Sequence, residues 1–501
     1  MSLPAGGPWP PPLTETVLAR MSVWDAWYTG DPDRLASIYG STMVPAARPS
    51  QYRGGIVGTV ARWFWGRPTP AGEQRSKLHV PLASDICQTS ADLLFSEPPV
   101  ATVEDERTQQ RLDELLDEGV HATLLEAAEV CAALGGVYLR PAWDTELADR
   151  PWLSVVHADA AVPEFRWGQL AAVTFWEELR AEGGIVLRHL ERHEPGMILH
   201  GLYEGTREDL GRMVPLTEHE ATAPLATEVD ENGAIYTGLD GLAAVYVPNM
   251  RPNRRWRSIR GAAQLGRSDL DGIEPLLDAL DEVYSSWMRE IQLGKARIVV
   301  PRSYLDSNGP GQGASFDPDR AVYEDVNALP RPGDPAAITP VQFAIRVAEH
   351  RDTAADLVEQ ILRTAGYSTQ TFGRTGDAAA TATEVVARER RSYLTRDKKV
   401  IYWSPLADAY RALLAVDAAV FRSGVQVVRP ALEWPDAVSE DPSSLANTAN
   451  VLRQAEAAST ETLVRMVHPD WEDAQVQAEV ERIQGETGRA VPDPMQDGLL
   501  P

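Results

Sequence analysis

The chain has few cysteines and no long apolar run. Its 501 residues include two cysteines, Cys87 and Cys131, which lie on apolar stretches and match no metal-ligand spacing or disulfide framework. We expect both thiols to be buried and reduced. No stretch reaches the roughly 18 apolar residues of a membrane-spanning helix, and the N-terminus lacks the basic and apolar regions of a signal peptide. These features predict a protein that is made in the cytoplasm.

Cations are scarce relative to carboxylates. The sequence holds 47 Lys and Arg against 73 Asp and Glu, which gives a formal net charge of −26. A protein that grips DNA or anionic lipid tightly needs a cationic surface, so this charge argues against a tightly held polyanion. The charge is compatible with simple solubility, and also with a surface that must not hold DNA firmly.

Recognisable catalytic and metal-binding motifs are also missing. The glycine-rich segment 309–313 lacks the Gly-Lys-Ser/Thr ending of a phosphate-binding loop, and no Gly-x-Ser-x-Gly motif occurs. His189 and His193 resemble half of a zinc site, but their surroundings alternate as in a strand, which would separate them by roughly 13 Å. We expect a structural or surface role for both. A cytoplasmic α/β hydrolase that uses an acid pair in the N-terminal half is the weaker alternative to a protein without enzymatic activity.

Two long amphipathic helices flank a strand-rich insert, and this is the most informative feature present. In the first helix, apolar residues recur every three or four positions and form one stripe. These residues are Leu270, Ile273, Leu277, Leu280, Tyr284, Trp287 and Ile291. We expect Gly294 to end the helix, and Pro275 either to start it or to kink its first turns. The second helix is predicted from a cap at Thr339, with Pro340 in its first turn, to Ala365, a length of roughly 39 Å.

The remaining chain predicts mixed helix and strand, and its length predicts two to four domains. Helices are expected over 14–28 and 109–134, and strands over 137–140, 153–157, 171–179, 185–194, 197–203, 297–300, 321–326 and 425–428. A long helix is expected from Thr381 to about Phe421, with a break or kink at Pro405. Two or three short helices should follow Asp441, the last of them capped by Asp470.

Two stretches concentrate cations. The segment 251–267 contains arginines and no acidic residue, and we interpret Arg254, Arg255, Arg257 and Arg260 as contacts between subunits through carboxylates, with phosphate binding as the alternative. Between Arg374 and Lys399, cations exceed acids beside a glycine-containing loop. This second stretch is the best candidate to face DNA, although a charged helix face is the commoner explanation for such a run.

Four stretches, taken in their order and spacing, carry a family resemblance. They are 79–95 (His79-Val80-Pro81-Leu82 through Leu93-Leu94-Phe95), Gly135-Gly136-Val137-Tyr138-Leu139, 277–291 with 295–299, and Thr381-Ala382-Thr383-Glu384-Val385. With the two long helices and the insert, the chain resembles the portal (head-to-tail connector) proteins of tailed bacteriophages from about residue 15 to 485. The resemblance implies an α+β, portal-like multidomain subunit with a mixed α/β wing, a two-helix stem, a small β-rich clip and a helical C-terminal crown.

The resemblance divides the chain into six parts. They are the N-terminal wing (1–267), stem helix 1 (268–294), the clip (295–338), stem helix 2 (339–366), a part with the tunnel loop, the long kinked helix and the return to the wing (367–439), and the crown with the C-terminal tail (440–501).

The function implied is a ring, usually of twelve subunits, at one vertex of the capsid in the virion, after assembly in the host cytoplasm. Such a ring conducts double-stranded DNA during packaging and ejection. Its implied partners are the terminase, head-completion (adaptor) proteins and major capsid or scaffold proteins, with no membrane, cofactor or metal. Another virion structural protein is the alternative.

The resemblance also places residues. Phe372, Gly373, Arg374 and Gly376 would lie on the tunnel loop. Arg388, Arg391, Lys398 and Lys399 would face DNA or a neighbouring subunit, and Leu277, Leu280, Tyr284, Trp287 and Ile291 would pack the stem. A sliding duplex needs a wall without strong phosphate sites, so excess carboxylate with a few cations at a constriction is consistent with this assignment.

Overall fold

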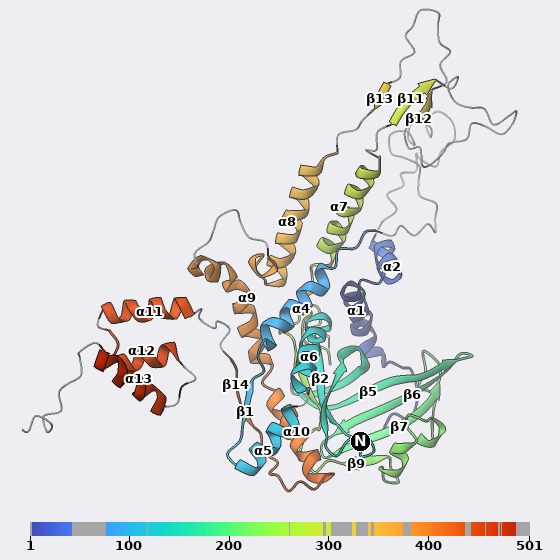
Figure 1. Cartoon of the computed structure of the whole chain (residues 1–501). Coiled ribbons are helices and arrows are strands. Elements are labelled where there is room, and N and C mark those ends of the chain that lie inside the picture. The colour runs from blue at the N-terminus through green and yellow to red at the C-terminus, as the bar shows by residue number, and fades with distance from the viewer. Residues whose placement is uncertain are drawn as a thin grey trace, which may run out of the picture. The chain divides into compact units, whose positions relative to one another are not determined.

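The structure is a computed structural model, and its described residues form two compact units (Figure 1). The described residues are 3–42, 77–117, 119–259, 261–293, 297–301, 323–326, 339–341, 345–373, 382–435, 442–455, 457–468, 471 and 473–486. The first unit comprises Met1–Gly376 with Arg388–Pro435, and the second comprises Asp377–Ala387 with Asp436–Pro501. Helices together with mostly antiparallel strands bear out the α+β class.

Two antiparallel sheets form the strand-rich part of the first unit. The smaller sheet has the order β10-β2-β3, with β2 (Gly136–Ala142), β3 (Trp152–His157) and β10 (Val245–Pro248). The larger has the order β4-β5-β6-β7-β8, with β9 paired to β7. Its strands are β4 (Ala161–Arg166), β5 (Gln169–Glu182), β6 (Ile185–Glu194), β7 (Met197–Gly205), β8 (Arg212–Val214) and β9 (Ala234–Tyr236). The strands predicted between 137 and 203 are confirmed, and Glu194 of β6 pairs with Met197 of β7 across a tight turn.

Helix α4 lies between two hydrophobic cores of the first unit. Its Ile86 and Cys87 belong to a core shared with α1 (Pro12–Thr29) and α2 (Pro32–Thr42), whereas its Leu94 and Phe95 belong to a second core. The helix spans Leu82–Phe95. Cys131 lies in the second core, so both thiols are buried as predicted.

The helix predicted over 109–134 is wrong as a single element. The chain forms α5 (Glu106–Asp117) and α6 (Val120–Leu134), with Gly119 between them at φ 82°. A left-handed residue cannot continue a right-handed helix, and glycine takes that conformation without steric cost. The predicted end of the segment is confirmed, because Gly135 stands at φ 88° after α6.

The two long helices, α7 (Glu274–Leu293) and α8 (Val347–Ala365), lie side by side (Figure 1). Pro275 lies in the first turn of α7, so the helix starts there rather than being kinked. Gly366 ends α8 at φ 104°, as predicted. Gly294 lies outside the described residues.

The predicted start of the second helix at Thr339 is wrong. Thr339–Val341 is strand β13, and α8 begins at Val347, which shortens the helix to roughly 28 Å. Strand β13 is an edge strand of a small sheet of order β12-β11-β13, where a proline is tolerated because one side needs no ladder bond. The predicted strands of the insert are confirmed as β11 (Arg297–Pro301) and β12 (Tyr323–Val326). The glycine-rich segment 309–313 lies outside the described residues.

After α8 the chain forms two helices, α9 and α10, and then one short strand. Helices α9 (Ala382–Tyr402) and α10 (Leu406–Ala419) are separated at Pro405, which confirms the predicted break. Residues of α9 from Arg388 onward belong to the first unit. The strand predicted over 425–428 is wrong, since the amide of Gln426 donates to the Thr108 hydroxyl instead of to a strand. The strand at this end of the chain is β14 (Ala431–Glu433), which pairs with β1 (Val100–Thr102).

The second unit contains three short helices, which confirms the helices predicted after Asp441. They are α11 (Pro442–Gln454), α12 (Thr460–Val467) and α13 (Asp473–Glu486). The hydroxyl of Ser459 caps α12 by accepting from the amide of Thr462 at 3.2 Å. Asp470 lies outside the described residues. No helix in the described part of the chain is both long enough and apolar enough to span a bilayer.

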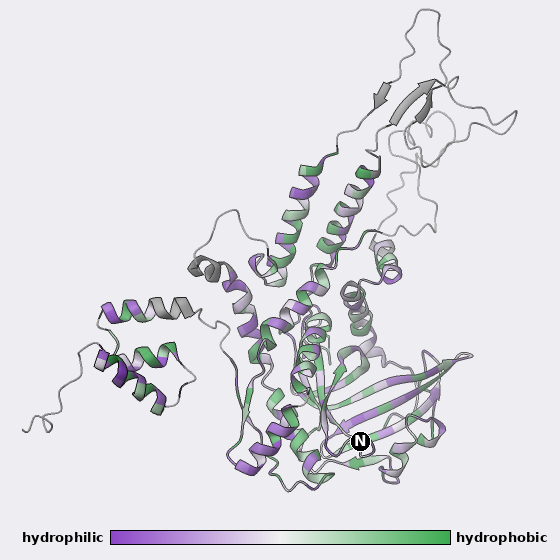
Figure 2. Ribbon diagram, viewed as in Figure 1, coloured by the Kyte–Doolittle hydropathy of each residue, from purple (hydrophilic) through white to green (hydrophobic). Residues whose placement is uncertain are grey.

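The apolar stripe of α7 is buried at its start and exposed near its end. Leu277 and Leu280 are 1% and 0% exposed, Tyr284 and Trp287 are half-buried, and Ile291 is 41% exposed. Figure 2 shows hydrophobic and hydrophilic residues alternating along both long helices. The ends of the helices are joined by Glu290, which accepts from the Arg346 guanidinium and lies 3.2 Å from the His350 ring.

Truncation of the buried start of this stripe should cost more than truncation of its exposed end. We expect Leu280→Ala to lower the free energy of unfolding by about 2–5 kcal/mol, because the surrounding core cannot close the cavity. The matched change Ile291→Ala should cost less than about 1 kcal/mol. Chemical denaturation of both variants measures the difference, and equal losses would contradict this description of the stripe.

Candidate functional site

The segment predicted to form the tunnel loop follows the short helix η6 (Gln370–Phe372) and precedes α9. Gly373 ends η6 in the left-handed region at φ 71°. Phe372 is half-buried against Tyr367, with ring centroids 6.3 Å apart. Arg374 and Gly376 lie outside the described residues, so only the flanks of the loop are placed.

Hydrogen bonds tie α9 to the chain just before the loop. The Ser392 hydroxyl accepts from the amide of Ser368 at 2.9 Å and lies 2.8 Å from the Thr371 hydroxyl. The Thr395 hydroxyl donates to the carbonyl of Gly366 at 2.6 Å. The middle of α9 is therefore fixed to the residues that precede the loop.

Farther along α9, Lys399 forms a buried ion pair. The Lys399 ammonium donates to the Asp269 carboxylate at 2.5 Å, and the two side chains are 1% and 0% exposed. The ammonium also donates to the Ser90 hydroxyl of α4 at 2.6 Å. The prediction that Lys399 faces DNA or a neighbouring subunit is wrong, because this side chain is enclosed within its own chain.

Asp269 accepts hydrogen bonds from three side chains. The Oδ2 atom, which accepts from Lys399, also accepts from the Tyr367 hydroxyl at 2.7 Å. The Oδ1 atom accepts from the side-chain amide of Asn249 at 2.7 Å. The backbone amide of Asp269 donates to Ala132 of α6. Asp269 and its partner Lys399 thus link the residues before α7, the residue after Gly366, and helices α4, α6 and α9.

The sequence reasoning missed Asp269, Ser90 and Tyr367. Their partners are far away in sequence, so no local spacing points to them. A signal existed for Lys399, since Ser392, Thr395, Lys399 and Trp403 recur at helical spacing and all four are buried. A lysine on the buried side of a helix requires a buried acid somewhere in the fold.

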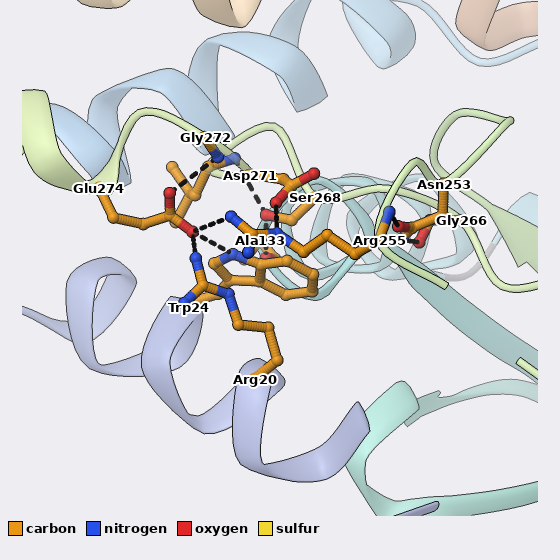
Figure 3. Close-up of polar contacts among 11 residues, drawn as sticks. Arg20, Trp24, Ala133, Asn253, Arg255, Gly266, Ser268, Asp271, Gly272 and Glu274 are labelled. Carbon is orange, nitrogen blue, oxygen red and sulfur yellow. Dashed lines mark hydrogen bonds and ion pairs between the residues drawn. The ribbon is translucent and has the colours of Figure 1, made fainter. Parts of the chain in front are cut away.

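The start of α7 is held by a second polar cluster, which Figure 3 shows. Glu274 accepts from the Arg20 guanidinium and, at 2.9 Å, from the Trp24 indole of α1. Arg255 donates to Asp271 and lies 3.8 Å from Glu274. Glu274 also accepts from the amide of Gly272 at 2.7 Å, which closes the turn before the helix.

This cluster gives one of the predicted arginines a partner within its own chain. Arg255 pairs with Asp271 and keeps 42% of its side chain exposed, so its role between subunits stays a prediction. Arg254 and Arg257 are exposed, and neither has an ion-pair partner within the described part of the chain. Arg260 lies outside the described residues. These three also remain candidates for contacts between subunits.

The other predicted cations differ in their surroundings. Arg391 and Lys398 are exposed on α9, and the Arg391 guanidinium donates to the carbonyl of Arg363 at the end of α8. Arg388 lies on α9, and its side chain is outside the described residues.

A cavity of about 550 Å³ opens among β2, β3 and β5 to β7, and we call it the strand cavity. Glu191 and His193 contact each other at 2.6 Å, and His189 lies 3.2 Å from His200. Arg140 pairs with Glu191 at 3.0 Å. His189 and His193 thus have structural partners, and no group of three or more metal-ligand residues suited to a metal occurs in the described chain.

Burial shifts the pKa values of the histidines that line the strand cavity. It lowers the pKa of His200 to about 4, and it also lowers the pKa of His189. Burial alone would raise the pKa of Glu191, but Arg140 and the hydrogen bond from His193 hold that pKa well below its usual range. The cavity therefore contains neutral imidazoles beside an ionised carboxylate at neutral pH.

Comparisons with known proteins show a family. The family model described as "Phage portal protein, SPP1 Gp6-like" matches residues 209–493, which include both long helices, the insert and α9. No curated protein sequence matches the chain.

Three solved structures are similar at 13% sequence identity over 86% of this chain. They are "Virion of native gene transfer agent (GTA) particle" (TM-score 0.37, 98% of that chain covered), "Neck of native GTA particle computed with C12 symmetry" (0.37, 97%) and "Neck of empty GTA particle computed with C6 symmetry" (0.38, 97%).

Removal of one partner of the buried ion pair should lower the stability of the fold. We expect Lys399→Met to lower the free energy of unfolding by about 3–5 kcal/mol, because Asp269 is left as an uncompensated buried charge. The neighbouring exposed change Lys398→Met should stay within about 0.5 kcal/mol. The double variant Lys399→Met with Asp269→Asn should recover much of the loss. Denaturation of the three variants tests this, and an equal cost for both lysine variants would contradict the buried pair.

Acid should destabilise the fold through His200. Its pKa lies near 4 when folded against an ordinary value of 6.5, so the unfolded chain binds the proton first and the free energy of unfolding falls as the pH drops from 6.5 to 4. The contribution is on the order of 3 kcal/mol. The variant His200→Gln should lose less stability between pH 7 and pH 4.5 than the parent. Parallel losses in urea titrations at the two pH values would rule out this residue as the cause.

Proposed function

The chain belongs to the family of SPP1 Gp6-like phage portal proteins, whose subunits form a ring at one capsid vertex, and from this membership we propose that it is the conduit for DNA packaging and ejection. The observation that carries the proposal is the family match over residues 209–493, because that range contains the paired long helices, the insert and the flanks of the loop. The ring has twelve subunits in this proposal, and it resides in the virion after assembly in the host cytoplasm.

The proposed partners follow from this place in the particle. Double-stranded DNA passes through the ring, the terminase docks on it during packaging, and head-completion proteins replace the terminase afterwards. Major capsid or scaffold proteins surround its wider part. The role is structural, and the proposal assigns no catalytic residue or cofactor.

The proposed division of the subunit follows the elements. Helices α7 and α8 form the stem, the sheet of β11, β12 and β13 forms the clip, and α11 to α13 form the crown. The remaining elements, α9 and α10 included, form the wing. We assign strand β13 to the clip because it pairs with β11, whereas the sequence-based division placed residues 339–341 in the stem.

The tunnel loop is proposed as the part that meets DNA. Phe372, Gly373, Arg374 and Gly376 belong to it, and Arg388 lies near its far flank on α9. The hydrogen bonds of Ser392 and Thr395 support this role, because they hold α9 to the chain that leads into the loop. A few such cations guide a duplex, while the net charge of −26 keeps other contacts weak.

If the loop meets DNA, a substitution in it should impair DNA packaging without impairing ring assembly. Arg374→Glu should leave rings intact in negative-stain images and reduce the packaged DNA per particle severalfold, because the added carboxylate repels phosphate. The matched control is Arg212→Glu, whose 78%-exposed side chain lies on β8, far from Arg374 in the sequence. Full packaged-DNA yield in the Arg374 variant would remove this residue from the DNA site.

A further inference from the structure

One side of α9 exposes large apolar residues beside cations. Leu394 and Ile401 are 48% and 70% exposed, and Arg391 and Lys398 are exposed as well. Helical spacing places these four residues within about 80° of one another around the axis. We call this set of four residues the α9 face.

The composition of the α9 face fits a protein partner better than DNA. Contacts to a phosphate backbone are made by cationic and polar groups, which gain nothing from two large aliphatic side chains. Exposed apolar residues ringed by charge are typical of the centre of a protein–protein contact. A partner surface should therefore be apolar and acidic.

The strand cavity offers such a surface on the same unit. Its rim carries Leu147 and Trp152, which are 77% and 36% exposed. Its wall carries the carboxylates Asp144, Glu177 and Glu228 in addition to the Glu191 that Arg140 neutralises. Because the buried imidazole of His200 stays neutral, the cavity is net acidic at neutral pH. Charge and apolar character thus complement the α9 face.

The two surfaces lie on different flanks of the first unit. Figure 1 shows α9 on one side of α4 and α6, and strands β5 to β7 on the other side. A contact between two different patches on opposite flanks is heterologous, and such contacts close into a ring when the rotation fits.

We propose that the α9 face of one subunit docks on the strand cavity of a second copy of this chain, in the ring. Leu394 and Ile401 cover Leu147 and Trp152, and the Lys398 ammonium lies over the carboxylates at the mouth of the cavity. The inference rests on the proposed function, and it assigns Arg391 and Lys398 to the contact between subunits rather than to DNA.

Cysteine cross-linking tests the contact directly. The variant Ile401→Cys with Leu147→Cys is oxidised after assembly and separated on a non-reducing denaturing gel. The native Cys87 and Cys131 are 0% and 1% exposed, so the new thiols react alone. We expect a ladder from dimer to complete ring. The matched control is Ile401→Cys with Val100→Cys, since Val100 is 60% exposed but lies on β1, outside the cavity, and it should give no ladder.

A charge exchange provides a second readout. Lys398→Glu should raise the protein concentration at which half the subunits are in rings by about tenfold, because it sets like charges against each other. Adding Glu177→Lys to the same chain should restore assembly. A ladder or a charge rescue supports the contact, and the absence of both, with rings still seen by negative stain, overturns it. A parent protein that forms no rings would instead overturn the proposed function.

Discussion

The buried pair of Lys399 and Asp269 is the constraint on which the rest of the first unit depends. Two opposite charges without solvent are stable only together, so the carboxylate before α7 and the ammonium on α9 must stay in contact. Tyr367, Asn249 and Ser90 complete their hydrogen bonding. The start of one long helix, the end of the other and the helix after the loop therefore share one fixed point. A displacement at the loop flanks would be transmitted to the long helices through it.

This rigidity suits a conduit. Ser392, Thr395 and Lys399 hold α9 to the residues that precede the loop, whereas the end of α7 carries exposed Ile291 and Met288. The acidic chain also offers few cations that could hold phosphate. The buried network explains how one subunit keeps α9 and the residues before the loop in contact.

Local signals made much of the fold predictable from sequence. Proline and glycine act on the backbone by their own chemistry, so the break at Pro405 and the helix ends before Gly135 and Gly366 were foreseen. Thr339-Pro340-Val341 misled because the same three residues suit a helix start and an edge strand, and only pairing with β11 decides between them. The loop was identified by resemblance, but its anchoring was not, because Asp269 and Lys399 are 130 residues apart in sequence.

The central claim is that this chain is one subunit of a closed ring around a channel. Single-particle electron microscopy of the purified full-length protein tests it most directly. The account predicts rings with a central opening wide enough for a B-form duplex, with the paired helices α7 and α8 in the wall of each subunit. Isolated monomers at micromolar concentration, or rings whose opening is too narrow for a duplex, would contradict it.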